Sequence, residues 1–287
     1  MIAPPSSVVS VELSHITYGH VDAVATITLD RPEVLNVISA GPGGTRDQIL
    51  EALGEAEQDP RIGCVVIAGA GSSFSAGGDL TGNPRRATPA DEQVFVEGSE
   101  DFHRRLRASR VPIVAAVHGF CLGAALGMAI SCDVVVAAEG AQFGIPEGRL
   151  GLVGATPLVP LVGRQWAKFM IMTGELLSAS RAREIGLVLD VVADVELADR
   201  AAELARRISR MPRAAVLLNR RAVDAVADGI ELAGVRAGRA HDVVTLANAP
   251  HAQAPDGTSF RAILDRSGMS GLKAARAQQW TEPWLRE

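Results

Sequence analysis

The feature of the sequence that most constrains its fold is a long run without a charged side chain, from Val111 to Cys132. The run is long enough to cross a bilayer, which takes about 20 apolar residues. However, Pro112, His118 and three glycines interrupt it. We therefore interpret it as a buried strand over 113–117, a turn, and a buried helix over 123–131, and we expect no membrane segment.

Other segments of the chain indicate the same alternation of strands and helices. Residues 64–68 form a β-branched run with glycines on either side, which is typical of a buried strand. A further strand is expected over 133–137, and helices are expected over 46–57 and 91–108. Strands that alternate with helices predict an α/β fold with parallel strands joined by crossover connections.

The N-terminal end predicts a β-hairpin. Val8–Ile16 and Val21–Leu29 are both rich in β-forming residues. The residues Tyr18–His20 separate the two runs and are therefore predicted to form the turn, and Asp30–Pro32 ends the hairpin.

The C-terminal part of the chain predicts helices alone. From Val195 onward, apolar residues recur at helical spacing. One apolar face is formed by Ala215, Leu218, Ala222 and Ala225. We therefore expect an α/β core over residues 1–195 and a helical region over residues 196–287.

Composition and charge exclude several classes of protein. Hydrophobic residues make up 47% of the chain and charged residues 21%, which is too apolar for a disordered protein. The net charge of −5 argues against a general nucleic-acid binder. The three cysteines lie in apolar segments without metal-ligand spacing, so we expect reduced thiols, no bound metal and a cytoplasmic location. The first residues lack the basic start and apolar core of a signal peptide.

Two glycine-rich turns and one acidic residue form the candidate site. The turns are Phe74–Leu80 and His118–Gly127, and the acidic residue, Glu147, ends the segment Ala141–Glu147. Small residues allow bare backbone amides to approach a ligand. Two such turns can supply two N–H donors to one oxygen, and a carboxylate beside that oxygen can move a proton on the neighbouring carbon.

Other kinds of glycine-rich site fit less well. A phosphate-binding P-loop requires a lysine, and none follows Gly77 and Gly78. A dinucleotide-binding fingerprint requires a third glycine after Gly69 and Gly71, which residues 72–74 do not supply. The sequence also lacks a Gly-x-Ser-x-Gly nucleophile turn and the spacing of common metal ligands. An oxyanion pocket is therefore the favoured interpretation.

The order of these motifs resembles the crotonase superfamily, the enoyl-CoA hydratases and isomerases. The matching segments are, in order, Ala25–Asn36, Phe74–Leu80, Pro112–Gly119 with Gly123, Cys132–Asp133, Ala141–Glu147, and Thr173–Glu175 with Ala182 and Gly186–Val188. No single segment decides the resemblance, which covers roughly residues 8–245 and depends on the order and spacing of all of them.

The resemblance implies a fold, an assembly and a ligand. The fold is built from repeated ββα units, and C-terminal helices drive assembly into a homotrimer or a dimer of trimers. The ligand is an acyl-CoA thioester, and no separate cofactor is needed because coenzyme A is part of the substrate. The thioester carbonyl is expected between the N–H groups of Gly78 and Ala124, each of which can be worth about 3 kcal/mol in the transition state. The acyl-CoA-binding residues implied in the same way are Arg31, Ala76, Gly77, Asp79, Leu80 and Gly123.

Two positions decide which reaction the resemblance implies. Hydratases of the family use two glutamates; Glu147 matches the second, but the first falls on Gly127, which has no side chain to titrate. Isomerases of the family work with a single glutamate at the position of Glu147. We therefore favour double-bond isomerisation by Glu147 through an enolate, with hydration by Glu147 alone as one alternative and an acyl-CoA binder with little turnover as another.

Several residue roles stay open at this point. A glycine inside a helix costs up to about 1 kcal/mol, so Gly127 calls for a local reason, either room for a bulky acyl group or close contact with another helix. For Asp79 we favour a structural role, and for His103 a packing role over a catalytic one. Arg31 and the pair Arg85–Arg86 are candidates for contacts with the coenzyme phosphates, with solvent exposure as the alternative.

Overall fold

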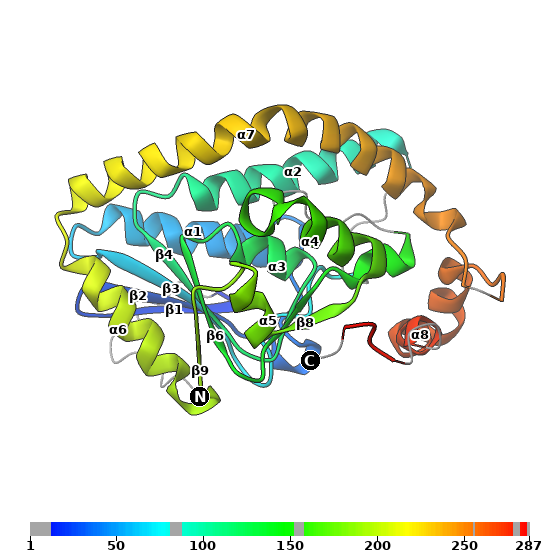
Figure 1. Cartoon of the computed structure of the whole chain (residues 1–287), viewed down its shortest axis with the longest axis horizontal. Helices are drawn as coiled ribbons and strands as arrows, with labels where there is room; N and C mark the ends of the chain where they lie inside the picture. Colours follow the sequence, from blue (N-terminus) through cyan, green and yellow to red (C-terminus); the bar gives the residue numbers. More distant parts are fainter. Residues whose placement is uncertain (1–12, 81–87, 152–157, 255, 278–281, 286–287) are drawn as a thin grey trace.

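The computed structural model describes residues 13–80, 88–151, 158–254, 256–277 and 282–285, with only the backbone given for 228, 230–237 and 239. Six strands form the main sheet in the order β1-β2-β3-β4-β6-β9 (Figure 1). Their bounds are β1 Ile16–Val21, β2 Val24–Leu29, β3 Cys64–Gly69, β4 Ile113–Val117, β6 Val134–Ala138 and β9 Asp190–Val192. All neighbouring strands are parallel except β1 and β2. The predicted α/β class with parallel strands is therefore confirmed.

The N-terminal hairpin forms, but its predicted turn is wrong. Tyr18–His20 lie inside β1, where Tyr18 pairs with Ile27 and His20 pairs with Ala25. The chain reverses instead at Asp22 and Ala23, and Asp22 adopts a left-handed backbone conformation with φ 52°. Tyrosine favours a strand, and aspartate tolerates this conformation better than most residues, so the turn forms four residues further on. The start of the predicted hairpin, residues 8–12, lies outside the described residues.

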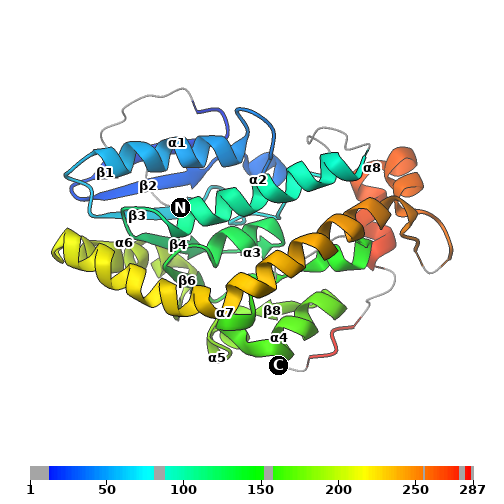
Figure 2. The same ribbon diagram turned by 90° about the horizontal axis from the view of Figure 1, so that it is seen from above.

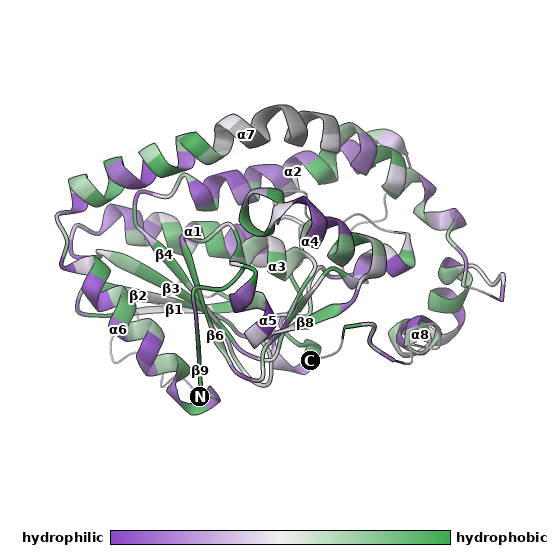
Figure 3. Ribbon diagram, viewed as in Figure 1, coloured by the Kyte–Doolittle hydropathy of each residue, from purple (hydrophilic) through white to green (hydrophobic). Residues whose placement is uncertain are grey.

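Side chains alternate between the two faces of the main sheet. Val65 and Ile67 belong to the larger core, together with apolar residues of α1 (Thr45–Gln58), α2 (Pro89–Arg107) and α3 (Ala124–Ala129). The intervening Cys64 and Val66 face α6 (Leu197–Ser209) on the opposite side. Both faces are therefore buried, which is why these strands are continuous apolar runs rather than alternating ones. Figure 3 shows the central strands mostly in the hydrophobic colour.

Pairs of consecutive strands divide between two sheets. The two pairs are β4 with β5 (Phe120–Leu122) and β6 with β7 (Gln142–Gly144). The first strand of each pair belongs to the main sheet. The second strand belongs to a smaller sheet that also contains β8 (Leu176–Ser178). After β5 the chain enters α3, and after β7 it passes through the 3-10 turn η2 (Pro146–Leu150) to α4 (Val159–Thr173). This repeated ββα connection agrees with the predicted fold and brings the ends of β5 and β7 to one edge.

The C-terminal helices surround this core. After α5 (Ala179–Glu184) and α6, the long helix α7 (Arg213–Asn248) runs beside α2, and α8 (Phe260–Ala277) lies at its far end (Figures 1 and 2). Because α6 covers one face of the main sheet, it packs as part of the core. The division at residues 195 and 196 stays a prediction. None of the described helices is long and apolar enough to span a membrane.

Candidate active site

The candidate site lies where three segments of the smaller sheet end side by side. Ser75 pairs with Cys121 in parallel, and Cys121 pairs with Phe143 in parallel, so the three residues form one row. Parallel segments that start from one row end at the same edge. Gly78 and Ala124 each come three residues after their row members, Ser75 and Cys121. Glu147 comes four residues after Phe143. The three predicted pieces therefore meet.

The first segment presents the N–H of Gly78. The residues on either side of Gly78 are hydrogen-bonded to Ile38. The Ile38 N–H donates to the Gly77 carbonyl at 2.8 Å, and the Asp79 N–H donates to the Ile38 carbonyl at 3.0 Å. In a parallel pairing of this kind the N–H of the residue between them, here Gly78, points away from Ile38. Among the described residues, none accepts a hydrogen bond from the Gly78 N–H. Gly77 itself has φ 103°, and a Cβ there would lie 2.7 Å from the Leu122 carbonyl oxygen, so only glycine fits.

The loop before this segment is held by one buried side chain. The Asn36 amide Nδ2 donates to the carbonyls of Ala70 and Ser73, each at 2.8 Å, while Asn36 Oδ1 accepts from the Arg31 N–H at 2.9 Å. The Asn36 side chain therefore links residues 31–36 to the loop that precedes the first glycine-rich turn. This fixes the position from which Gly78 is presented.

The second segment presents the N–H of Ala124. Gly123 begins α3 with φ 51°, and its N–H donates to the Gly144 carbonyl at 2.9 Å. The Ala124 N–H is the first of the helix and has no acceptor among the described residues, as is usual at a helix start. A Cβ built on Gly77 would lie 3.7 Å from the Ala124 nitrogen, and one built on Gly78 would lie 3.7 Å from the Ala124 Cβ. The two free amides are thus neighbours.

Glu147 places its carboxylate against the start of α3. A Cβ at Gly123 would lie only 2.3 Å from Glu147 Oε1, so Gly123 gives the carboxylate its space. Burial raises the pKa of Glu147 from 4.5 to about 7, while its backbone N–H and the charge of Arg276 act in the opposite direction. A carboxyl group with a pKa near neutrality can both take and return a proton. The carboxylate and the two amides together can stabilise and protonate an enolate.

The remaining predicted binding residues surround the first segment. Ala76 donates its N–H to the Leu35 carbonyl at 2.9 Å, and Leu80 is exposed with 43% of its surface accessible. Asp79 is buried, with 7% accessible, in keeping with a structural role. Arg31 is partly exposed, and its guanidinium makes no ion pair with a described residue. The other phosphate candidates, Arg85 and Arg86, lie outside the described residues.

The structure gives a reason for Gly127. A Cβ at this position would lie 3.0 Å from Cε1 and 3.2 Å from Nε2 of the His103 imidazole, which extends from α2. These distances are shorter than ordinary van der Waals contact. Of the two reasons left open by the sequence, the structure shows close contact with a neighbouring helix. His103 therefore occupies the space next to α3 that a side chain at 127 would need.

Two residues near the site could not be singled out with a role from the sequence. The charge of Arg276, from α8, reaches Glu147, and burial lowers the pKa of Arg276 itself. Arg46 is buried on α1 with its guanidinium over the rings of Phe95 at 5.4 Å and Phe102 at 5.8 Å, and its charge helps to lower the pKa of His103. No sequence motif marks either residue, because each is brought there by packing of a distant helix.

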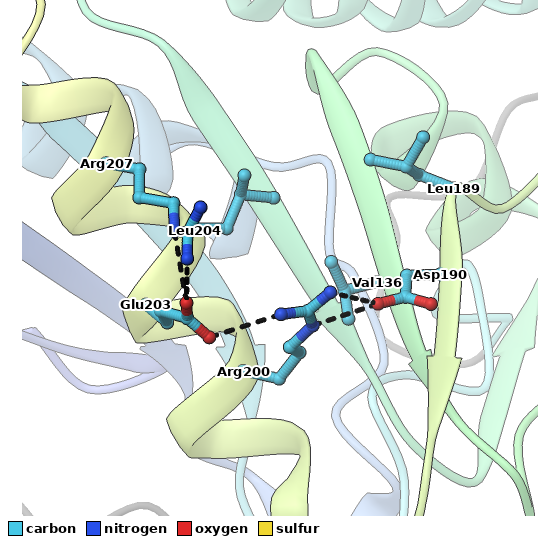
Figure 4. Close-up of a pocket in the computed structure, with 7 residues that line it drawn as sticks. All are labelled: Val136, Leu189, Asp190, Arg200, Glu203, Leu204 and Arg207. Atoms are coloured by element: carbon cyan, nitrogen blue, oxygen red, sulfur yellow. Dashed lines mark hydrogen bonds and ion pairs between the residues drawn. The ribbon is translucent and has the colours of Figure 1, made fainter.

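A separate surface pocket lies between β9 and α6, away from these residues (Figure 4). Its charged groups are paired: Arg200 binds Asp190 at 2.9 Å and Glu203 at 3.1 Å, and Arg207 binds Glu203 at 2.6 Å. Such a network satisfies its own charges and leaves none for a ligand. Elsewhere in the described part of the chain, no group of three or more His, Cys, Asp or Glu side chains could hold a metal ion.

Comparison with known proteins agrees with this geometry. The family model for enoyl-CoA hydratase/isomerase matches residues 19–258. The chain belongs to this family. The match includes both glycine-rich turns, Glu147 and the whole of α7. The crotonase fold predicted from the motifs is thereby confirmed.

Individual relatives of this family member include both reaction types. A short-chain-enoyl-CoA hydratase of Clostridium acetobutylicum is 35% identical over 218 residues, which are 74% of this chain and 82% of the relative. A 1,2-epoxyphenylacetyl-CoA isomerase of Escherichia coli is 37% identical over 221 residues, 74% of this chain and 81% of the relative. A crystal structure of an enoyl-CoA hydratase/isomerase from Xanthobacter autotrophicus Py2 superimposes with a TM-score of 0.80 at 31% identity, covering 93% of this chain and 98% of that one. Identity alone therefore does not separate hydration from isomerisation.

Proposed function

We propose that this enzyme binds an acyl-CoA thioester, forms its enolate and moves a double bond by a proton shuttle through Glu147. The observation that carries the proposal is the meeting of three groups at one edge. The Gly78 and Ala124 amides are neighbours, and the Glu147 carboxylate lies against Gly123, directly before the second amide. The pKa of Glu147, about 7, suits a group that takes and returns a proton.

The reaction follows from this arrangement. The thioester oxygen accepts hydrogen bonds from the Gly78 and Ala124 N–H groups. Glu147 removes a proton from the carbon next to the carbonyl, and the electron pair of that C–H bond passes into an enolate whose charge lies on the thioester oxygen. Fixed amides stabilise this charge without reorganising. The protonated Glu147 then returns the proton two carbons away, and the double bond becomes conjugated with the carbonyl.

Hydration is the second candidate, and one observation favours it. The His103 imidazole lies beside Gly127, where hydratases of the family have their first glutamate, so the site has a second polar group. An acyl-CoA binder without turnover is less well supported, because the Glu147 carboxylate lies against Gly123 and burial raises its pKa to about 7.

A single substitution tests the proposed role of Glu147. In deuterium oxide, wild-type protein should exchange the α-protons of a saturated acyl-CoA, which mass spectrometry detects. Glu147→Gln should abolish this exchange while coenzyme A still raises the thermal stability by mass action. Glu139→Gln is the matched control, since it makes the same change at an exposed position. Unchanged exchange in Glu147→Gln would remove this residue from the mechanism, and no stabilisation by coenzyme A would reject the ligand class.

The proposal extends to assembly and location. We propose a homotrimer or a dimer of trimers, supported by the apolar face of α7, on which Ala215, Leu218, Ala222 and Ala225 are all exposed in a single chain, Leu218 with 63% accessible. A contiguous apolar face of this kind is typical of an interface. A cytoplasmic location is supported by the three cysteines, which are all free. The chemistry needs no cofactor apart from the coenzyme A of the substrate.

A further inference from the structure

His103 is held in one orientation by a serine on the neighbouring helix end. The Ser131 hydroxyl donates to the Gly127 carbonyl at 2.8 Å, and its oxygen lies 3.2 Å from His103 Nδ1. A hydroxyl group has only one hydrogen to donate, and Ser131 donates it to the Gly127 carbonyl. The Ser131 oxygen must therefore accept a hydrogen bond from His103 Nδ1–H. The ring therefore carries its hydrogen on Nδ1 and has a lone pair on Nε2.

The Nε2 atom is the free end of this arrangement. Within the described residues no donor binds it. Burial, together with the charges of Arg46 and Arg107, lowers the pKa of His103 to about 3. The ring is thus neutral at pH 7, and Nε2 is a hydrogen-bond acceptor rather than a donor.

The position of this acceptor relative to Glu147 follows from α3. The Gly127 N–H donates to the Gly123 carbonyl at 2.9 Å, so the two glycines are one helical turn apart. Glu147 lies against the first glycine and His103 against the second. Two positions four residues apart in a helix are separated by about 6 Å along its axis. The Glu147 carboxylate and the neutral His103 acceptor thus both lie against the first turn of α3.

We propose that His103 is a second catalytic group, whose Nε2 accepts a hydrogen bond from a water that Glu147 also holds, and that the enzyme adds this water to C3 of a 2-enoyl-CoA. The inference rests on the proposed function, because the same amides and the same carboxylate activate the thioester. It deepens the hydration candidate by naming the residue of this chain that would hold the water.

The atoms balance without another reactant. The water oxygen bonds to C3, the C2–C3 π pair moves into the enolate, and one water proton passes to Glu147. Glu147 then gives a proton to C2 and the enolate returns to the thioester. The product is a 3-hydroxyacyl-CoA whose hydroxyl group still donates a hydrogen bond to His103 Nε2. Both side chains end in their starting protonation states.

Two substitutions at His103 separate this role from packing. His103→Leu keeps most of the bulk but has no acceptor, whereas His103→Gln retains an oxygen that can accept. With 2-enoyl-CoA thioesters of short, medium and long chains, wild type should form 3-hydroxyacyl-CoA, detected by mass spectrometry. His103→Leu should lower this rate by about tenfold, the effect of one hydrogen bond to a polar group, and His103→Gln should recover most of it. Exchange of α-protons by Glu147 should fall by less than hydration in both variants.

Folding and the underlying function are checked in the same experiment. If His103→Leu is too unstable, Ser131→Ala releases Nδ1 and should also lower hydration more than exchange. An equal loss of hydration and exchange would indicate a structural role and overturn the proposal. So would wild-type exchange without hydration of any 2-enoyl-CoA, or full hydration by His103→Leu. In contrast, absence of both exchange and coenzyme A binding in wild type would reject the proposed function itself.

Discussion

Replacing Glu147 by glutamine should stabilise the folded protein at pH 8 although it removes the proposed base. Burial raises the pKa of this carboxyl group from 4.5 to about 7. Between these values the folded state binds the proton and the unfolded state does not. The free energy of unfolding therefore falls as the pH rises through this window, and the whole cost of burying the charge is present above pH 7.

The magnitude follows from the two pKa values. A difference of 7 − 4.5 ≈ 2.5, at about 1.4 kcal/mol for each pKa unit, corresponds to about 3 kcal/mol. Glutamine is neutral at every pH and has nearly the same shape. The stability of Glu147→Gln minus that of wild type should therefore rise by up to about 3 kcal/mol between pH 4 and pH 8. For a chain of this size the corresponding change in melting temperature is about 5 °C.

The assay is urea unfolding of both proteins at one concentration and several pH values. His103 and other groups titrate in both proteins, so their contributions cancel in the difference. Glu139→Gln, which makes the same change at an exposed position, is the matched control. A flat difference for Glu147→Gln, or one that falls toward pH 8, would refute the argument that Glu147 is desolvated in the folded state.

Two further substitutions test packing and assembly. Gly127→Ala should lower the free energy of unfolding by about 1–2 kcal/mol, because its Cβ would lie 3.0 Å from His103. In a His103→Ala background the same substitution should instead raise it by up to about 1 kcal/mol, through helix propensity. Urea unfolding of the four proteins of this cycle measures the coupling, and additivity would contradict the contact. Leu218→Glu should shift the protein toward smaller species in sedimentation velocity, whereas Asn219→Glu, which adds the same charge at another exposed position of α7, should not. Equal behaviour of the two variants would reject this face as the interface.

Local patterns were sufficient to predict five of the six strands of the main sheet, but not the short edge strand β9. The apolar runs at 64–68 and 113–117 correspond to β3 and β4, and the helix predicted over 91–108 corresponds to α2. Burial on both faces of the sheet produces such runs. The glycines near their ends are needed because the backbone there leaves no room for a side chain. The hairpin turn was misplaced, because strand-forming and turn-forming residues are mixed between Tyr18 and Ala23 and only the pairing register decides between them.

The candidate site was predictable in its parts but not in its contacts. Gly78, Ala124 and Glu147 could be named from motifs, whereas their meeting depends on the row formed by Ser75, Cys121 and Phe143. The contact of His103 with Gly127 depends on how α2 packs against α3, and the approach of Arg276 depends on α8. Packing between elements distant in the sequence leaves no local pattern to read.

The glycines of the site differ in what they exclude, and this difference shows where its chemistry is open to change. Gly77 and Gly123 have positive φ and close neighbours, the Leu122 carbonyl at Gly77 and the Glu147 carboxylate at Gly123, so any side chain there disrupts the candidate site itself. Gly127 has ordinary helical geometry, and only the His103 ring opposes a side chain at this position. Positions 103 and 127 are therefore coupled by a contact between two helices. Under the proposed mechanism, the position that carries the polar group determines whether Glu147 acts beside a neutral imidazole or beside a second carboxylate.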